Sequence, residues 1–169
     1  MIVVDIETTG VDPQKHQMVS IGAVDYDTGE TFYGECRIYK FDEWTQEALN
    51  INGFTLEQIH DEKKQTPFEL YERFVKWASP RSSMLAGHNI GGFDLQFLKQ
   101  AQCRGRKNTT FPFRYQTVDL HSVAFSRFKK SYSMSKICQM LGIKPEPEIH
   151  NALTGAQKEY ECFKILLAE

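Results

Sequence analysis

The first residues of the chain carry its strongest secondary-structure signal. Residues 2–6 are a largely β-branched run, interrupted by Asp5, that leads into Thr8-Thr9-Gly10, a pattern typical of a buried strand that ends at a turn. Two more strand-like segments follow over residues 19–26 and 31–38, and a turn sequence over residues 27–30 separates them. The opening of the chain is therefore expected to form a sheet that contains a hairpin.

Beyond the hairpin the apolar residues change from a period of two toward a period of 3.6. This pattern predicts helices over residues 67–78, 93–102, 120–128, 133–141 and 152–167, and short strands over residues 84–87 and 115–118. Three early strands followed by alternating helices and strands indicate an α/β fold, in which helices flank a mixed five-stranded sheet. With 169 residues, no internal repeat and no linker-like tract, we expect a single domain over residues 1–169.

The charge balance bears on the kind of partner. The formal net charge is −2, so no global positive field indicates nucleic-acid binding, and any such binding must be local. Basic side chains gather in two places, and aromatic residues accompany the second group. The first group is Lys99, Arg104, Arg106 and Lys107; the second is Arg127, Lys129 and Lys130 with Phe125, Phe128 and Tyr132. Each group is either a solvated surface or a patch that follows phosphates.

The four cysteines indicate a reducing environment. Cys36, Cys103, Cys138 and Cys162 are scattered without a CxxC pair, and no apolar run reaches membrane-spanning length. We therefore expect free thiols in a cytoplasmic protein that has no membrane partner.

Two carboxylates on the first strand are the first candidates for chemistry. Asp5 and Glu7 are two residues apart, so their side chains leave the same face of a strand while Val4 and Ile6 point the other way. A divalent cation between them would remove their repulsion, and oxygen ligands suit Mg²⁺ or Mn²⁺. The alternative is an ordinary strand whose polar face lies in water.

Two later segments add further polar candidates. Asp94 follows His88-Asn89-Ile90-Gly91-Gly92-Phe93 and falls in the first turn of a predicted helix, where a carboxylate also serves as a cap. His150 precedes the last predicted helix, where it acts either as a general base or as a surface or capping residue.

Taken together, in this order and at these spacings, the three segments resemble the motifs of the DEDDh 3′→5′ exonuclease superfamily, which includes proofreading exonucleases and ribonuclease T. The resemblance covers nearly the whole chain and rests on Asp5-Ile6-Glu7-Thr8-Thr9-Gly10, on the His88 to Asp94 segment, and on His150-x-Ala152 with Ala156. It implies a ribonuclease H-like fold and a metal-dependent nuclease that releases nucleoside 5′-monophosphates from DNA or RNA 3′ ends.

The resemblance also implies roles for individual residues. Asp5, Glu7 and Asp94 would hold two divalent ions, Mg²⁺ or Mn²⁺, and His150 would accept the proton of the attacking water. The expected substrate contacts are Thr8, Thr9, Gly10, Asn89 and Phe93. The expected partners are single-stranded DNA or RNA 3′ ends, together with a polymerase or another protein if the chain is an editing subunit.

One position departs from the family pattern. The family has an aspartate five residues after the histidine of the third motif, where this chain has Gly155. Three explanations compete: a loss of activity, a metal site completed by water, or a carboxylate supplied from elsewhere. We favour Glu159, one helical turn later, because helical side chains lean toward the N-terminus and a glycine at 155 leaves the path of the Glu159 side chain open. The alternative to an enzyme is a catalytically impaired module that binds nucleic-acid 3′ ends.

Overall fold

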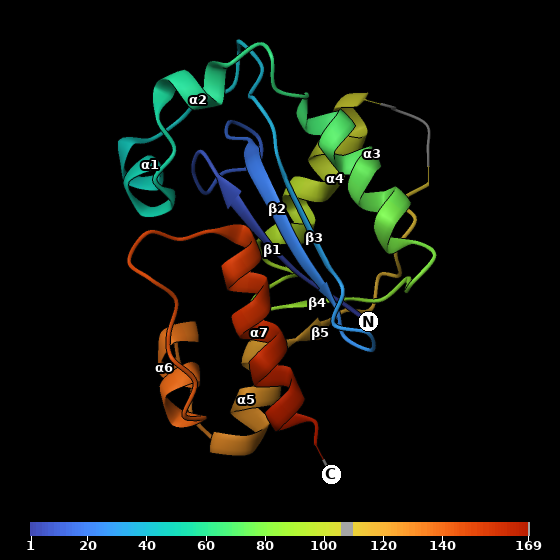
Figure 1. Ribbon diagram of the computed structural model, residues 1–169, viewed down its shortest axis with the longest axis vertical. Helices are drawn as coiled ribbons and strands as arrows, with labels where there is room; N and C mark the ends of the chain where they lie inside the picture. The colour runs from blue at the N-terminus through green and yellow to red at the C-terminus, as the bar shows by residue number, and fades with distance from the viewer. Residues whose placement is uncertain (106–109, 169) are drawn as a thin grey trace.

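The computed structural model describes residues 1–105 and 110–168, in which a five-stranded sheet forms the centre of the molecule (Figure 1). Arg106 and Lys107 of the first basic group lie outside the described residues. The strands are β1 (Ile2–Thr8), β2 (Met18–Asp25), β3 (Thr31–Glu35), β4 (Leu85–Gly87) and β5 (Val118–Asp119). Their order is β3-β2-β1-β4-β5, with β1, β2 and β3 paired antiparallel and β1, β4 and β5 paired parallel. The predicted mixed five-stranded sheet and its hairpin are confirmed.

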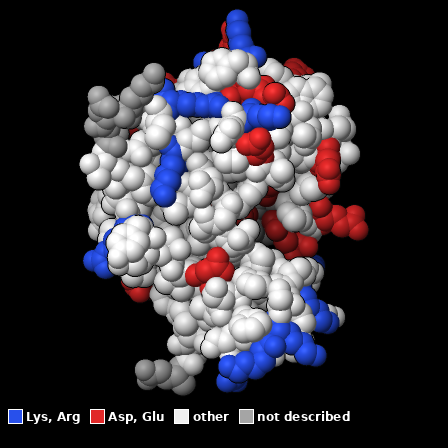
Figure 2. Space-filling model, turned by 180° about the vertical axis from the view of Figure 1, so that it is seen from behind, with Lys and Arg blue, Asp and Glu red and all other residues white. Residues whose placement is uncertain are grey.

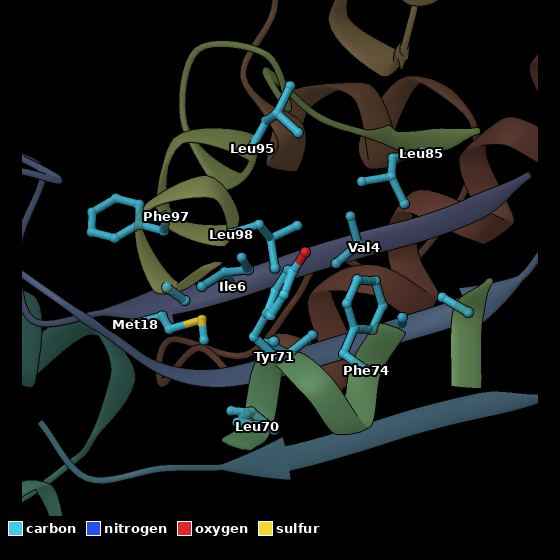
Figure 3. Packing of buried hydrophobic residues seen from close by; sticks show 14 of the residues in the cluster. Val4, Ile6, Met18, Leu70, Tyr71, Phe74, Leu85, Leu95, Phe97 and Leu98 are labelled. Carbon is cyan, nitrogen blue, oxygen red and sulfur yellow. The ribbon is translucent and has the colours of Figure 1, made fainter. Parts of the chain in front are cut away.

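Helices cover both faces of this sheet. One face carries α3 (Pro67–Ala78) and α4 (Asp94–Gly105), and the other carries α5 (Leu120–Phe128), α6 (Met134–Met140) and α7 (Ala152–Leu166). On the α3 and α4 face, Val4 and Ile6 of β1 point toward Leu98, Tyr71 and Phe74 (Figure 3). The five predicted helices are present, with ends that differ by up to three residues.

The side chains of strand β1 point alternately toward the two layers of helices that cover the sheet. Val4 and Ile6 belong to the core cluster under α3 and α4, whereas Val3 belongs to the cluster under α5, α6 and α7. Because alternate residues of a strand share a face, Asp5 and Glu7 lie on the side of Val3, toward α7. The strand thus turns its carboxylates to the layer from which the last helix approaches.

Two short helices were missed by the periodicity. Helix α1 (Gln46–Asn52) begins at the N-cap Thr45 and ends at Gly53, whose φ is 73°, and α2 (Leu56–His60) begins at a capping box formed by Thr55 and Gln58. Both are too short to show an apolar period, but the caps mark their ends. They pack on a small cluster that contains Leu49 and Ile59.

Two predicted strands were too long. Residues 36–38 lie beyond the end of β3, and the strand expected over residues 115–118 is reduced to Val118–Asp119. Tyr115 is 86% exposed, so its aromatic side chain reflects a surface position and not a strand of the sheet.

The structure also bears on the expectations of free thiols and of no membrane-spanning segment. Cys36, Cys103, Cys138 and Cys162 are free. Within residues 1–105 and 110–168, none of the helices combines the length and the apolar character needed to cross a bilayer.

Candidate active site

Three segments that are distant in sequence meet at one edge of the sheet. Because β1 and β4 are parallel neighbours, their carboxyl ends lie at the same edge, which brings Glu7 near the His88 to Asp94 segment. Helix α7 crosses β2 at Gly22, where any side chain would overlap the backbone of Ala152. This close approach places the start of α7, and therefore His150, beside the end of β1.

Gly155 is in contact with the Asp5 carboxylate. A Cβ at position 155 would overlap Asp5 Oδ2, so the carboxylate of Asp5 fills the space that a side chain at 155 would need. The expectation was that this glycine leaves a path for Glu159. The structure differs: the glycine makes room for Asp5, and Glu159 approaches from further along the helix.

The Glu159 side chain points into the protein and not into solvent. The residue is 5% exposed, its Oε1 accepts a hydrogen bond from the backbone N of His88 at 3.1 Å, and its Oε2 is buried without a hydrogen-bond partner in the described part of the chain. Its carboxylate also lies next to Gly87 at the end of β4. Glu159 is thus a buried acid at the meeting point of β4 and α7, unlike its more exposed neighbours on the helix.

Asp94 is buried in the same region. It is the first residue of α4 and is 3% exposed, and its Oδ1 has no hydrogen-bond partner among the described residues. A carboxylate that served only as a helix cap would not leave a buried oxygen unsatisfied, because such an oxygen costs free energy. Two buried acids, Asp94 and Glu159, therefore each keep one oxygen available.

The crowding of these acids disfavours their charged forms. Burial raises the pKa of Asp5 from 3.8 to about 7, and the nearby charge of Glu146 adds to this effect. Burial raises the pKa of Glu7 from 4.5 to about 9, and Asp5 contributes to the shift. Burial, followed by repulsion from Asp5, holds the pKa values of Asp94 and Glu159 well above their usual range. Without a cation, the group therefore resists full ionisation.

His150 stands at the rim of this group. Its side chain is 48% exposed, and its backbone N donates a hydrogen bond to the carbonyl of Ile51 in α1 at 2.8 Å. Its Nδ1 lies 3.8 Å from Oε2 of Glu146.

Possible ligand atoms of Glu7, Glu146 and His150 all lie within 4.8 Å of one another, and no group that contains Asp5, Asp94 or Glu159 is as tight within the described residues. Sequence reasoning missed Glu146, because a loop glutamate between two prolines carries no periodic signal.

A cleft of about 660 Å³ connects these residues to solvent. Figure 2 shows acidic side chains gathered around a hollow on the face opposite to the view of Figure 1. Of the predicted site residues, those that line the cleft are Asp5, Glu7, Thr8, Gly10, Asn89, Phe93, Asp94, His150 and Glu159. Helix α1 adds Glu47, Ile51 and Asn52, which the sequence reasoning did not include.

Thr9 is the predicted contact that the structure does not bring into the cleft. It is fully buried, its hydroxyl donates to the carbonyl of Glu43 at 2.7 Å, and it accepts from the backbone N of Gln17 at 3.0 Å. Thr9 therefore holds together the loops behind β1. Phe93 does line the cleft, but its ring also packs against the ring of Phe97, with the two ring centroids 5.1 Å apart, so Phe93 belongs in part to the core.

Comparison with known proteins agrees with the fold. The model of a family described as exonuclease (RNase T) matches residues 2–163. A DNA polymerase III subunit epsilon from Rickettsia typhi is 30% identical, with 98% of this chain and 72% of that protein aligned. A PolC-type DNA polymerase III from Thermotoga petrophila is 29% identical over 96% of this chain, which spans only 11% of that polymerase. Exonuclease I of Escherichia coli, solved with a dT13 oligonucleotide, superposes with a TM-score of 0.79 at 17% identity, covering 98% of this chain and 40% of exonuclease I.

The fold and the site together define a class of protein, which has a ribonuclease H-like fold and an acidic cleft at the edge of its sheet. More specifically, the chain belongs to the exonuclease family, within the DEDDh superfamily of 3′→5′ exonucleases. The family resemblance drawn from the three motifs is confirmed. Enzymes of this family depend on divalent metal ions and act on DNA or RNA.

Proposed function

We propose that the chain removes nucleotides from the 3′ ends of single-stranded DNA or RNA by hydrolysis, with two Mg²⁺ or Mn²⁺ ions held by Asp5, Glu7, Asp94 and Glu159. The observation that carries the proposal is the convergence of four buried or half-buried carboxylates, from β1, α4 and α7, on one cleft beside His150. Divalent cations in this cleft would remove the repulsion among the four carboxylates.

The donor set fits such ions. All four side chains offer carboxylate oxygens, which Mg²⁺ and Mn²⁺ prefer, and Asp94 and Glu159 each keep a buried oxygen without a partner among the described residues. The four acids line one cleft and come from three elements, and a two-metal site is an arrangement in which such carboxylates share ions about 3.5–4 Å apart. When bound, the ions would polarise the scissile phosphate and neutralise the charge that develops on it.

His150 would act as the general base. It stands at the mouth of the cleft, half exposed, and its backbone is fixed to α1 by the hydrogen bond to Ile51. In the proposed reaction, a ring nitrogen accepts a proton from water while the water oxygen attacks phosphorus, and the bond from phosphorus to the 3′ oxygen breaks. The products are a nucleoside 5′-monophosphate and a strand that is shorter by one nucleotide and ends in a 3′ hydroxyl.

The end of the strand would be held by the walls of the cleft. Thr8 and Gly10 follow the carboxylates of β1 and line the cleft, so they would approach the terminal sugar. Asn89 is exposed, adopts a φ of 56° and lines the cleft beyond the end of β4, where it would meet the phosphate. The edge of Phe93 would support a base. Thr9 would act indirectly, by fixing the loop that carries Gly10.

The test uses single-stranded DNA and RNA labelled at either end, incubated with Mg²⁺, with Mn²⁺ or with EDTA. We expect stepwise loss of mononucleotides from the 3′ end only with metal, and loss of at least about a hundredfold in rate for His150→Ala and Asp5→Asn. Tight binding of 3′ ends without release, by wild-type protein with metal, would contradict the proposal and favour an impaired binding module. A role as the editing subunit of a polymerase, as the epsilon relative suggests, would appear as co-purification with a polymerase.

A further inference from the structure

Glu146 is a loop residue whose side chain is turned toward the active site. It lies between Pro145 and Pro147 in the segment that joins α6 to α7, and its side chain is only 16% exposed, whereas Glu148 two residues later is exposed. Proline fixes φ, so the two flanking residues restrict the loop. The carboxylate is also anchored, because Oε1 accepts a hydrogen bond from the backbone N of Asn151 at 3.0 Å.

The second oxygen of Glu146 faces a gap shared with two other groups. Oε2 lies 3.8 Å from Nδ1 of His150, too far for a hydrogen bond, and ligand atoms of Glu7, Glu146 and His150 all lie within 4.8 Å of one another. Glu7 is 9% exposed, and no hydrogen bond to its carboxylate is present among the described residues. A nearly buried carboxylate without a partner thus points at the same gap as a second, anchored carboxylate.

Neither Gly155 nor Glu159 supplies a carboxylate to the gap between Glu7, Glu146 and His150. Gly155 has no side chain, and the space above it is filled by Asp5. Glu159 is held on the other side of the site, where it accepts the hydrogen bond from His88 at the end of β4. On the side of Glu7 that faces His150, Glu146 is therefore the second carboxylate that the described chain offers.

We propose that Glu146 is a fifth acidic ligand of the site, which binds a divalent cation together with Glu7 on the side of His150. The inference rests on the proposed function, because it assumes that cations occupy the site. Carboxylate oxygens suit both Mg²⁺ and Mn²⁺, and Mn²⁺ serves as the probe because its resonance signal reports binding directly. The loop between α6 and α7 then contributes to metal binding as well as to the wall of the cleft.

The test measures Mn²⁺ binding to the full chain without nucleic acid, by titration calorimetry and by the loss of the free Mn²⁺ resonance signal. Glu146→Gln keeps an oxygen for the N–H of Asn151 but removes the charge, and Glu148→Gln removes the same charge from the same loop at an exposed position. We expect Glu146→Gln to weaken one class of Mn²⁺ site by about tenfold or more, and Glu148→Gln to change it by less than about twofold. Glu146→Asp keeps the charge but withdraws it by one methylene, and should give an intermediate loss if Glu146→Gln does not fold.

Equal Mn²⁺ affinity in Glu146→Gln and wild type would overturn the proposal. So would a fall in turnover with unchanged Mn²⁺ affinity, which would assign Glu146 to the orientation of His150 instead. Because binding is measured without substrate, a wild-type protein that binds Mn²⁺ through Glu146 but does not degrade nucleic acid would contradict only the proposed nuclease activity.

Discussion

At the scale of single residues, the contact between Gly155 and Asp5 sets the geometry of the acidic group. The Asp5 carboxylate occupies the space of a side chain at 155, and Glu159 reaches the group from one turn later on α7. The two positions are therefore coupled: a carboxylate supplied from 159 is compatible with a glycine at 155, and a carboxylate at 155 would displace Asp5.

This coupling predicts the effect of restoring the family aspartate. Gly155→Asp should lower activity and not raise it, because the new side chain overlaps Asp5 and adds another carboxylate to a group that already resists full ionisation. Gly155→Ala introduces the steric overlap with Asp5 without adding a carboxylate, and should lower the free energy of unfolding by about 1–3 kcal/mol. Turnover and urea unfolding of both variants check this, and a Gly155→Asp protein more active than wild type would refute it.

The raised pKa values of Asp5 and Glu7 predict how stability depends on pH. An acid whose pKa is higher in the folded protein stabilises the fold fully below its unfolded pKa, and that stabilisation is lost as the pH rises through the folded pKa. Without metal, the free energy of unfolding should therefore fall as the pH rises through about 7 for Asp5 and toward about 9 for Glu7. The half-buried His88, whose pKa is lowered by burial, acts with the opposite sign but only below its usual pKa of 6.5.

Thermal unfolding in EDTA and in Mg²⁺ between about pH 7 and pH 9 checks this expectation. Mg²⁺ should stabilise the protein more at the upper end of the range, because the carboxylates must lose their protons to bind it. The double variant Asp5→Asn with Glu7→Gln serves as the control and should weaken the dependence, with the remainder due to Asp94 and Glu159. A wild-type stability that stays constant or rises across this range in EDTA would contradict the account.

At the scale of elements, the start of α7 positions His150. Its N-cap Asn151 accepts hydrogen bonds from the backbone N of Leu153 and Thr154, and its Nδ2 donates to the Tyr33 hydroxyl at 3.3 Å. The cap thus ties the first turn of α7 to β3. Together with the bond from His150 to Ile51, it fixes the histidine from two sides.

Replacing this cap should therefore affect both stability and catalysis. Asn151→Ala should cost about 1 kcal/mol of unfolding free energy and also lower kcat, because His150 loses its fixed backbone. Thr66→Ala removes the cap of α3, which covers the other face of the sheet, so it should cost a similar stability and leave kcat unchanged. Equal kcat in the two variants, measured under conditions where both are folded, would show that the cap does not position His150.

The elements also show what the sequence could and could not predict. Residues 2–6 could be predicted from their β-branched run, which suits a strand buried on both faces. The longer helices could be predicted because burial on one face imposes an apolar period. Helices α1 and α2 could be found only from their caps, since seven and five residues are too few for a period. The place of Glu146 could not be predicted, because it depends on how a loop between prolines folds back over β1. The burial of Thr9 likewise depends on contacts with Glu43 and Gln17, which lie in other segments of the chain.

At the scale of the whole molecule, two hydrophobic clusters pack on opposite faces of one sheet and fix the strand β1 that carries the site. The carboxylates of β1 face α7. The opposite side of the same strand packs on α3 and α4 (Figure 3). The site therefore depends on a strand that is fixed from behind. Basic side chains, in contrast, gather at the lower edge in Figure 2, where α5 and α6 lie, away from the acidic hollow.

Because the carboxylates and the core under α4 lie on opposite faces of β1, substitutions in that core should change the stability of the protein without changing turnover. Leu98→Ala in the fully buried cluster should lower the free energy of unfolding by about 2–5 kcal/mol, whereas Leu56→Ala at a 44% exposed position should cost well under half of that. Chemical denaturation gives both values. Turnover per folded molecule should match wild type in each variant, and a selective loss of turnover in Leu98→Ala would show that the core also tunes the site.

The central claim is that Glu159 completes the acidic group of a working exonuclease. The most direct measurement compares kcat and Mn²⁺ affinity of Glu159→Gln with those of Glu161→Gln on 5′-labelled single-stranded DNA. Glu161 is on the same helix and pairs with Lys158 at 3.1 Å outside the buried group, so it controls for the loss of one charge. We predict that Glu159→Gln lowers both quantities by about 10- to 100-fold and that Glu161→Gln changes neither by more than about twofold. Wild-type turnover and Mn²⁺ affinity in a folded Glu159→Gln protein would contradict the claim.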